Sequence, residues 1–168
     1  MELSFWNIQL GDSISASALC NRIEFECQPE LLTICKQIEA YLLEHPTEIP
    51  DNEGAELILT VFGKVFDELT HIFLKERVLI FPEIVKRGID FEMPAPVIQL
   101  IQLTQEKINQ LLNRLRQLLN NFQMKPGWNN DWKNCVQQFF QLEKKIHQWI
   151  YVEQNMLYPA FLSNTPVN

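Results

Sequence analysis

Four segments of the chain repeat apolar residues every three or four positions, which is the spacing typical of amphipathic helices. They span approximately residues 15–44, 52–86, 96–122 and 131–162. The connections between them, at 45–52, 87–96 and 123–130, each combine Pro or Gly with Asp or Asn, residues that end helices or cap them. No stretch alternates with a period of two over a full strand. The pattern therefore predicts an all-α fold with four long helices.

Each segment carries one apolar stripe that we expect to face a common core. The stripe of the second segment consists of Ile58, Phe62, Val65, Leu69, Ile72 and Leu79. The stripe of the third segment consists of Val97, Leu100, Thr104, Ile108, Leu111, Leu115 and Leu118. Long helices joined by short connections favour antiparallel neighbours, so we predict an up-down-up-down four-helix bundle.

The whole chain, residues 1–168, is predicted to form a single domain. Residues 1–14 would form an N-terminal arm, and residues 163–168 a loose tail. Pro29 lies inside the first helical segment and is expected to bend it, because Pro cannot donate a backbone hydrogen bond. Phe5 and Trp6 in the arm are expected either to cover the bundle or to contact another chain.

Composition narrows the range of partners. The 168 residues are 46% apolar and carry a formal charge of −7 without a cluster of Lys or Arg, which disfavours nucleic acid. No apolar run reaches the roughly 18–20 residues that span a bilayer, so we expect no membrane insertion. The first residues lack the basic region of a signal peptide, which favours a cytoplasmic location. The four cysteines form no CxxC pair and are expected to be free, mostly buried thiols.

The second and fourth segments end on the same seven-residue pattern. ERVLIFP runs from Glu76 to Pro82 and EQNMLYP from Glu153 to Pro159, and both read Glu, two residues, two apolar residues, an aromatic residue and Pro. Helical phase places Glu76 and Glu153 on the apolar stripes. Because an unpaired buried carboxylate is costly, each Glu should be paired, metal-bound, protonated or near an open end of the bundle.

This repeated pattern resembles the hemerythrin-like superfamily, and within it the di-iron "repair of iron centres" proteins, which restore damaged iron–sulfur clusters. Their second helix reads His-x-x-Lys-Glu-Glu-x-x-Leu-Phe-Pro, which is matched here by Lys75, Glu76, Phe81 and Pro82. Their fourth helix reads His-x-x-x-Glu-x-x-x-Leu-Phe-Pro, which is matched by Glu153, Asn155, Leu157 and Pro159, with Tyr158 in place of Phe. The resemblance implies a four-helix bundle whose two glutamates once held iron.

The histidines that the resemblance requires are missing. In the family a His lies four residues before each metal-binding Glu, and those positions hold Ile72 and Trp149 here. The third-helix His aligns with Thr104. The candidates on the first helix are Asn21 and Glu24, and the sequence does not choose between them.

The remaining histidines are not placed to replace these missing ligands, and the cysteines are open to two interpretations. His45, His71 and His147 are out of phase with the stripes and are predicted to be surface or interface residues. Cys20 and Cys27 are roughly in phase with the first stripe. They could serve as ligands, although a buried Cys is more often a small apolar core residue.

Three interpretations of function remain. In the first, a degenerate hemerythrin-like bundle has lost its di-iron centre, binds no cofactor and acts as a non-enzymatic binding or regulatory module. In the second, an iron-binding protein related to iron–sulfur cluster repair or to the nitrosative or oxidative stress response uses an altered site built on Glu76, Glu153 and either Glu24 or Glu106. In the third, a small apolar ligand occupies the former metal site. The sequence identifies no protein partner and no oligomeric state.

Overall fold

The computed structural model describes residues 14–50 and 52–162, and within this part of the chain it contains helices and no strands. The predicted arm with Phe5 and Trp6 and the predicted tail lie outside the described residues, apart from Ile14. Four long helical segments contain the elements α1 (Ala16–Arg22), α2 (Gln28–Glu44), α3 (Asn52–Lys75), α4 (Phe81–Arg87), α5 (Ala95–Leu118) and α6 (Asn130–Val152). The predicted all-α fold with four helices is confirmed.

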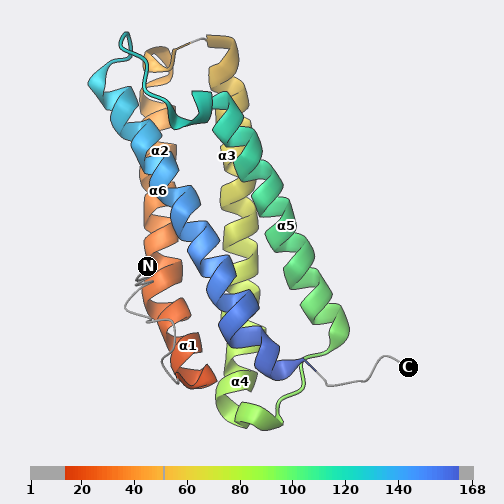
Figure 1. Ribbon diagram of the computed structural model, residues 1–168. Coiled ribbons are helices and arrows are strands. Elements are labelled where there is room, and N and C mark those ends of the chain that lie inside the picture. The colour runs from red at the N-terminus through yellow and green to blue at the C-terminus, as the bar shows by residue number, and fades with distance from the viewer. Residues whose placement is uncertain (1–13, 51, 163–168) are drawn as a thin grey trace.

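The helices pack side by side in a bundle (Figure 1). The chain ascends through α1 and α2, descends through α3 and α4, ascends again through α5 and descends through α6. The pair α3 and α5 forms the most extensive packing, followed by the pair α2 and α6. Large side chains fill the centre of the bundle, and the largest that are almost inaccessible are Trp132, Trp149, Phe62, Phe73 and Phe81. All four cysteines are free and buried, as predicted.

The helix ends follow local capping chemistry. The Ser15 hydroxyl accepts a hydrogen bond from the Ala18 backbone N–H at 3.2 Å, and the Asn129 side chain accepts one from the Trp132 N–H at 2.7 Å. The α5 helix stops at Leu118, earlier than the predicted residue 122, because residues 120–122 adopt positive φ angles and form a 3-10 turn instead.

Three of the four helical segments contain a π turn, in which a backbone N–H bonds to the carbonyl five residues earlier. These turns span Ile23–Cys27, Glu76–Ile80 and Glu153–Leu157. Each begins six residues before a proline, namely Pro29, Pro82 and Pro159. Pro lacks an N–H and its ring collides with the carbonyl four residues earlier, and the wider turn accommodates both defects. The irregularity expected at Pro29 therefore takes the form of a π turn followed by continued helix.

The predicted core stripes need two corrections. Leu79 is 64% exposed, because the π turn that begins at Glu76 rotates the following residues and brings Ile80 into the core instead. In α5 the predicted stripe is wrong at Leu100, which is 47% exposed, and at Thr104, which is only half-buried. The fully buried positions of this helix are Ile101, Gln105, Ile108, Leu112 and Leu115.

Candidate functional site: a buried glutamate pair

Glu76 and Glu153 meet in the core between the helices, and neither side chain is exposed to solvent. Each is the first residue of its π turn. Their carboxyl groups lie within hydrogen-bonding reach of each other. The repeated seven-residue pattern thus brings two carboxyl groups from the second and fourth helical segments to one point.

Glu76 receives two hydrogen bonds from other helices. Gln28 Nε2 donates to its Oε2 at 2.8 Å, and the Tyr158 hydroxyl donates to its Oε1 at 2.8 Å. Gln28 and Tyr158 occupy equivalent places, because each directly follows a π turn and directly precedes the proline. The π turns therefore position the donors as well as the glutamates.

Glu153 is held in the same way by two further donors. Gln105 Nε2 donates to its Oε2 at 2.7 Å, and the Trp149 indole Nε1 donates to its Oε1. Gln105 is fixed in turn by Gln154, whose Nε2 donates to Gln105 Oε1 at 2.8 Å. The Trp149 ring packs edge-on against Phe73 at a centroid distance of 5.0 Å. Each of the four carboxylate oxygens thus has one N–H or O–H donor.

The core environment favours protonation of this pair. Burial raises the pKa of Glu76 from 4.5 to about 7, even though its hydrogen bonds with Tyr158, Glu153 and Gln28 oppose the shift. Burial also raises the pKa of Glu153 well above its usual range, and the negative charge of Glu76 raises it further. Two carboxylates in contact cannot both ionise cheaply, so the pair holds at least one proton.

Two cysteine thiols lie close enough to the pair for its charge to affect their pKa values. Burial raises the pKa of Cys20 to about 12, and the charges of Glu153 and Glu76 add to the effect. The same causes raise the pKa of Cys27 well above its ordinary value. A thiol must ionise to act as a metal ligand or nucleophile. Both cysteines are therefore neutral core residues next to the pair.

The donor set around the glutamates does not fit an iron centre. Iron ligands offer lone pairs from imidazole or carboxylate. Here the carboxylate oxygens are instead occupied by donors from two carboxamides, an indole and a phenol. No group of three or more His, Cys, Asp and Glu side chains within 14–50 and 52–162 is arranged to hold a metal ion.

The residues predicted to stand at the ligand positions lie in different surroundings. Trp149 contacts Glu153, as its position four residues earlier on the helix requires. The α5 residue that reaches Glu153 is Gln105 rather than Thr104, whose hydroxyl bonds to the Leu100 carbonyl of its own helix. Ile72 is buried beside Thr104, and both line an apolar cleft of about 300 Å³ between α3 and α5.

On the first helical segment the residue that reaches Glu76 is Gln28, and neither earlier candidate does so. Asn21 is exposed and Glu24 is half-buried. Glu106 is also exposed. Among the histidines, His71 and His147 are exposed as predicted, while His45 is half-buried, stacks on Tyr41 and pairs with Glu48 at 3.3 Å.

Sequence reasoning missed the donors Gln28, Gln105 and Tyr158 as parts of the site. Gln28 and Tyr158 carried a usable signal, since each stands directly before a helical Pro, in the place that Phe81 takes in the second segment. Gln105 lies four residues after Ile101 and three before Ile108, which is a core position of α5. A carboxamide at such a position indicates a buried hydrogen-bond partner.

A second polar pair joins α5 to α6 further along the bundle. Glu143 is buried, and Arg116 donates to both of its oxygens, from Nε at 3.1 Å and from Nη2 at 2.9 Å. The Arg116 guanidinium also lies over the Phe122 ring, 5.6 Å from its centroid. This carboxylate is paired with a guanidinium, in contrast to the pair in the core.

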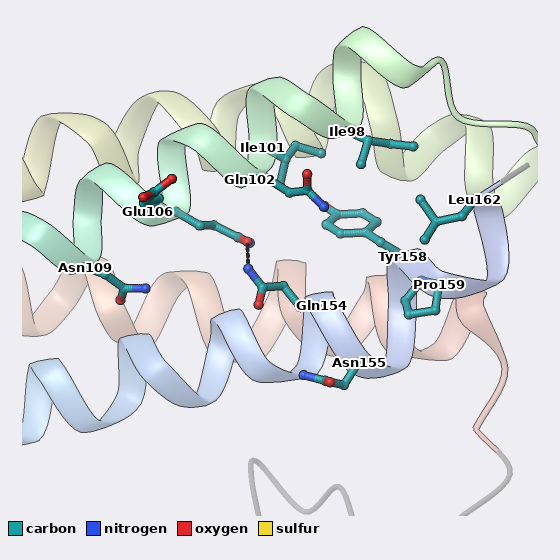
Figure 2. Close-up of a pocket in the computed structure, with 11 residues that line it drawn as sticks. Ile98, Ile101, Gln102, Glu106, Asn109, Gln154, Asn155, Tyr158, Pro159 and Leu162 are labelled. Carbon is teal, nitrogen blue, oxygen red and sulfur yellow. Dashed lines mark hydrogen bonds between the residues drawn. The ribbon is translucent and has the colours of Figure 1, made fainter. Parts of the chain in front are cut away.

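A polar cleft of about 470 Å³ lies directly outside the glutamate pair, between α5 and the last turns of the fourth segment (Figure 2). Gln105 and Tyr158, which donate to Glu153 and Glu76, both line it. The hydrogen bond between Gln105 and Gln154 crosses the cleft from one helix to the other. The inner wall of the cleft is thus made of the same side chains that hold the pair.

Two comparisons of this chain with known proteins found no match. No protein-family model matches this chain, and no curated protein matches it. Among the residues that the structure describes, none of the helices combines the length and apolarity needed to cross a membrane.

Proposed function

We propose that this chain is a hemerythrin-like four-helix bundle of up-down-up-down topology in which a proton-sharing glutamate pair replaces the di-iron centre. In this proposal the protein is a non-enzymatic binding or regulatory module that needs no metal. The observation that carries it is the one-to-one match between the four oxygens of Glu76 and Glu153 and four N–H or O–H donors.

The burial of the pair supports a structural role for it. A carboxyl group that acts as a general acid or base must reach a substrate atom within hydrogen-bonding distance. Glu76 and Glu153 have no solvent exposure, and their oxygens are already engaged. The hydrogen bonds of the pair thus connect the three π turns to one another. The clefts beside the pair remain open to a ligand.

The family resemblance supports an ancestry in iron or nitrosative-stress physiology, although fold alone does not determine activity. Four free, buried cysteines suit a reducing compartment, where thiols are not oxidised to disulfides. These thiols support a cytoplasmic location, which is part of the proposal.

Anaerobic iron binding tests the proposal. We expect purified protein to retain no stoichiometric iron after dialysis, and ferrous iron in excess to leave its melting temperature unchanged, because only a ligand of the folded state raises stability. About two bound irons per chain with a saturable rise in melting temperature would instead establish the carboxylate-rich iron protein. Apo protein in the presence of a chelator is the reference for both measurements.

A further inference from the structure

The polar cleft outside the glutamate pair has the features of a preformed ligand site. Its volume of about 470 Å³ lies in the range of small-molecule pockets, roughly 300–1,000 Å³. It follows α5 from Ile98 to Asn109, a length of about 16 Å at 1.5 Å per residue. The opposite wall comes from Gln154, Asn155 and the residues that follow.

The inner wall of this cleft is held rigid by the buried pair. Gln105 is fixed at both ends of its amide, through Glu153 and Gln154. Tyr158 is fixed by its hydrogen bond to Glu76. A ligand would therefore meet side chains that are already ordered, which lowers the entropic cost of binding.

One end of the cleft offers a buried hydrogen-bond acceptor that lacks a donor in the described part of the chain, and a carboxylate beside it. Asn109 Oδ1 is buried and accepts no hydrogen bond from the described part of the chain. Glu106 lies one turn away on the same helix and lines the same cleft. Buried acceptors are normally paired, so the unpaired Asn109 oxygen indicates a missing donor.

The opposite end of the cleft is apolar. Ile98 lines it from α5, and Tyr158, Pro159 and Leu162 line it from the end of the fourth segment (Figure 2). A ligand that spans the cleft would thus place an apolar or aromatic group here and a polar group near Glu106.

The charges around the cleft determine which polar group a ligand can carry. The lining of the cleft contains the carboxylate of Glu106 and no Lys or Arg. The whole chain carries −7. A negative potential without a compensating cation repels phosphate and carboxylate ligands and attracts ammonium groups.

We propose that this cleft binds a small amphipathic amine, with its ammonium group between Glu106 and Asn109 and its apolar body against Ile98, Tyr158 and Leu162. The inference deepens the proposed function, since it rests on the chain being a binding module and names the class of ligand.

Three probes that share one apolar body test the charge preference. They are phenylbutylamine, phenylbutanol and phenylbutyrate, titrated calorimetrically into the full chain in the presence of a chelator. We expect saturable binding of the amine, binding of the alcohol weaker by roughly two- to fivefold, which is the contribution of a partly solvated ion pair, and no saturable binding of the acid. Equal or tighter binding of the acid overturns the proposed ligand class, and failure of all three probes overturns the site.

Two pairs of variants locate the site. Glu106→Gln should abolish the preference for the amine over the alcohol, whereas Glu44→Gln, the same change at an exposed position at the far end of α2, should leave it intact. Gln102→Trp should fill the cleft from an exposed position and abolish amine binding, whereas Gln110→Trp, exposed on the same helix but outside the cleft, should not. An unchanged preference in Glu106→Gln, or unchanged binding in Gln102→Trp, overturns the proposal.

The metal assay and the amine titration fail independently. Iron binding by the wild-type chain would overturn the metal-free function without touching amine binding to the chelator-treated protein. Absence of amine binding would overturn this inference and leave the glutamate pair as it stands.

Discussion

Glu76 and Glu153 are 77 residues apart in the sequence and touch in the core, where four donors and one shared proton satisfy their oxygens. Each donor comes from a residue placed by a π turn or by the buried face of a helix. This arrangement lets an apolar bundle contain two carboxyl groups while burying at most a single charge.

Buried carboxyl groups that hold protons make stability depend on pH. The pKa of Glu76 rises from 4.5 in the unfolded chain to about 7 in the fold, so the folded state binds the proton more tightly. The stabilisation is fully present below pH 4.5 and is lost as pH rises through about 7. Between pH 4.5 and about 7, we expect the free energy of unfolding to fall by about 1.4 kcal/mol per pH unit for each proton that the folded state holds and the unfolded chain has released. Urea unfolding at a series of pH values measures the slope.

Glu153→Gln should flatten this slope. The pKa of Glu153 is also raised well above its ordinary range, so Glu153 contributes a second proton that the folded state binds more tightly than the unfolded chain, and Gln cannot take up that proton. The part of the slope that comes from Glu76 should remain, because burial and not Glu153 raises its pKa. The control is Glu44→Gln, which changes net charge equally at an exposed position. A slope unaltered by Glu153→Gln would show that Glu153 does not hold a proton in the folded state.

The hydrogen bond of Trp149 can be measured against a second buried tryptophan. Trp149 Nε1 donates to Glu153, whereas Trp132 Nε1 is buried and has no hydrogen-bond partner in the described part of the chain. Both indoles are almost inaccessible. We expect Trp149→Phe to lower the free energy of unfolding by about 1–3 kcal/mol more than Trp132→Phe, because it leaves a buried acceptor unsatisfied. Equal losses in denaturant unfolding would show that only packing matters.

The Arg116–Glu143 pair should be a stronger stabiliser than other ion pairs of the bundle. Arg116→Met leaves a buried carboxylate without its two donors, so it should lower the free energy of unfolding. We expect a loss of only about 1–3 kcal/mol, because the Arg side chain itself is nearly half exposed and solvent weakens the ion pair. Lys107→Met breaks the more exposed pair with Glu68 and should cost less than about 1 kcal/mol. Thermal or denaturant unfolding of the two variants compares them directly, and a larger loss for Lys107→Met would contradict the ranking.

The fold was largely predictable because the helices carry strong periodicity and the connections carry clear breakers. The site was half predictable. Glu76 and Glu153 stand out as charges on apolar stripes, but α5 has apolar residues on two adjacent faces, and the pattern favoured the face of Leu100 and Thr104 over that of Ile101 and Gln105. A one-residue shift of this kind turns a helix by about 100° and exchanges the residue that points to the core. The π turns had the same effect at Leu79, although the prolines that accompany them were visible in the sequence.

Rebuilding an iron site is the most demanding test of the proposed ancestry. Gln28 and Gln105 now occupy the positions from which the first and third helices reach the glutamates, and Trp149 occupies the position on the fourth. We expect the triple variant Gln28→His, Gln105→His and Trp149→His to be less stable without metal, by up to about 3–5 kcal/mol, the cost of truncating a buried Trp to Ala. Imidazole lone pairs would replace three of the four donors, so anaerobic ferrous iron should raise its melting temperature in a saturable manner.

The matched control keeps Trp149→His and moves the other two histidines to Ile72 and Thr104. These side chains line the apolar cleft between α3 and α5 rather than the space around the pair, so the variant should lose stability without gaining an iron response. A response of this control alone would show that the histidine positions inferred from the family are correct and that the contacts of Gln28 and Gln105 are not the vestige of a metal site. If neither variant responds, the proposal of a vestigial iron site is wrong, and only the proposed resemblance in fold and in the repeated pattern remains.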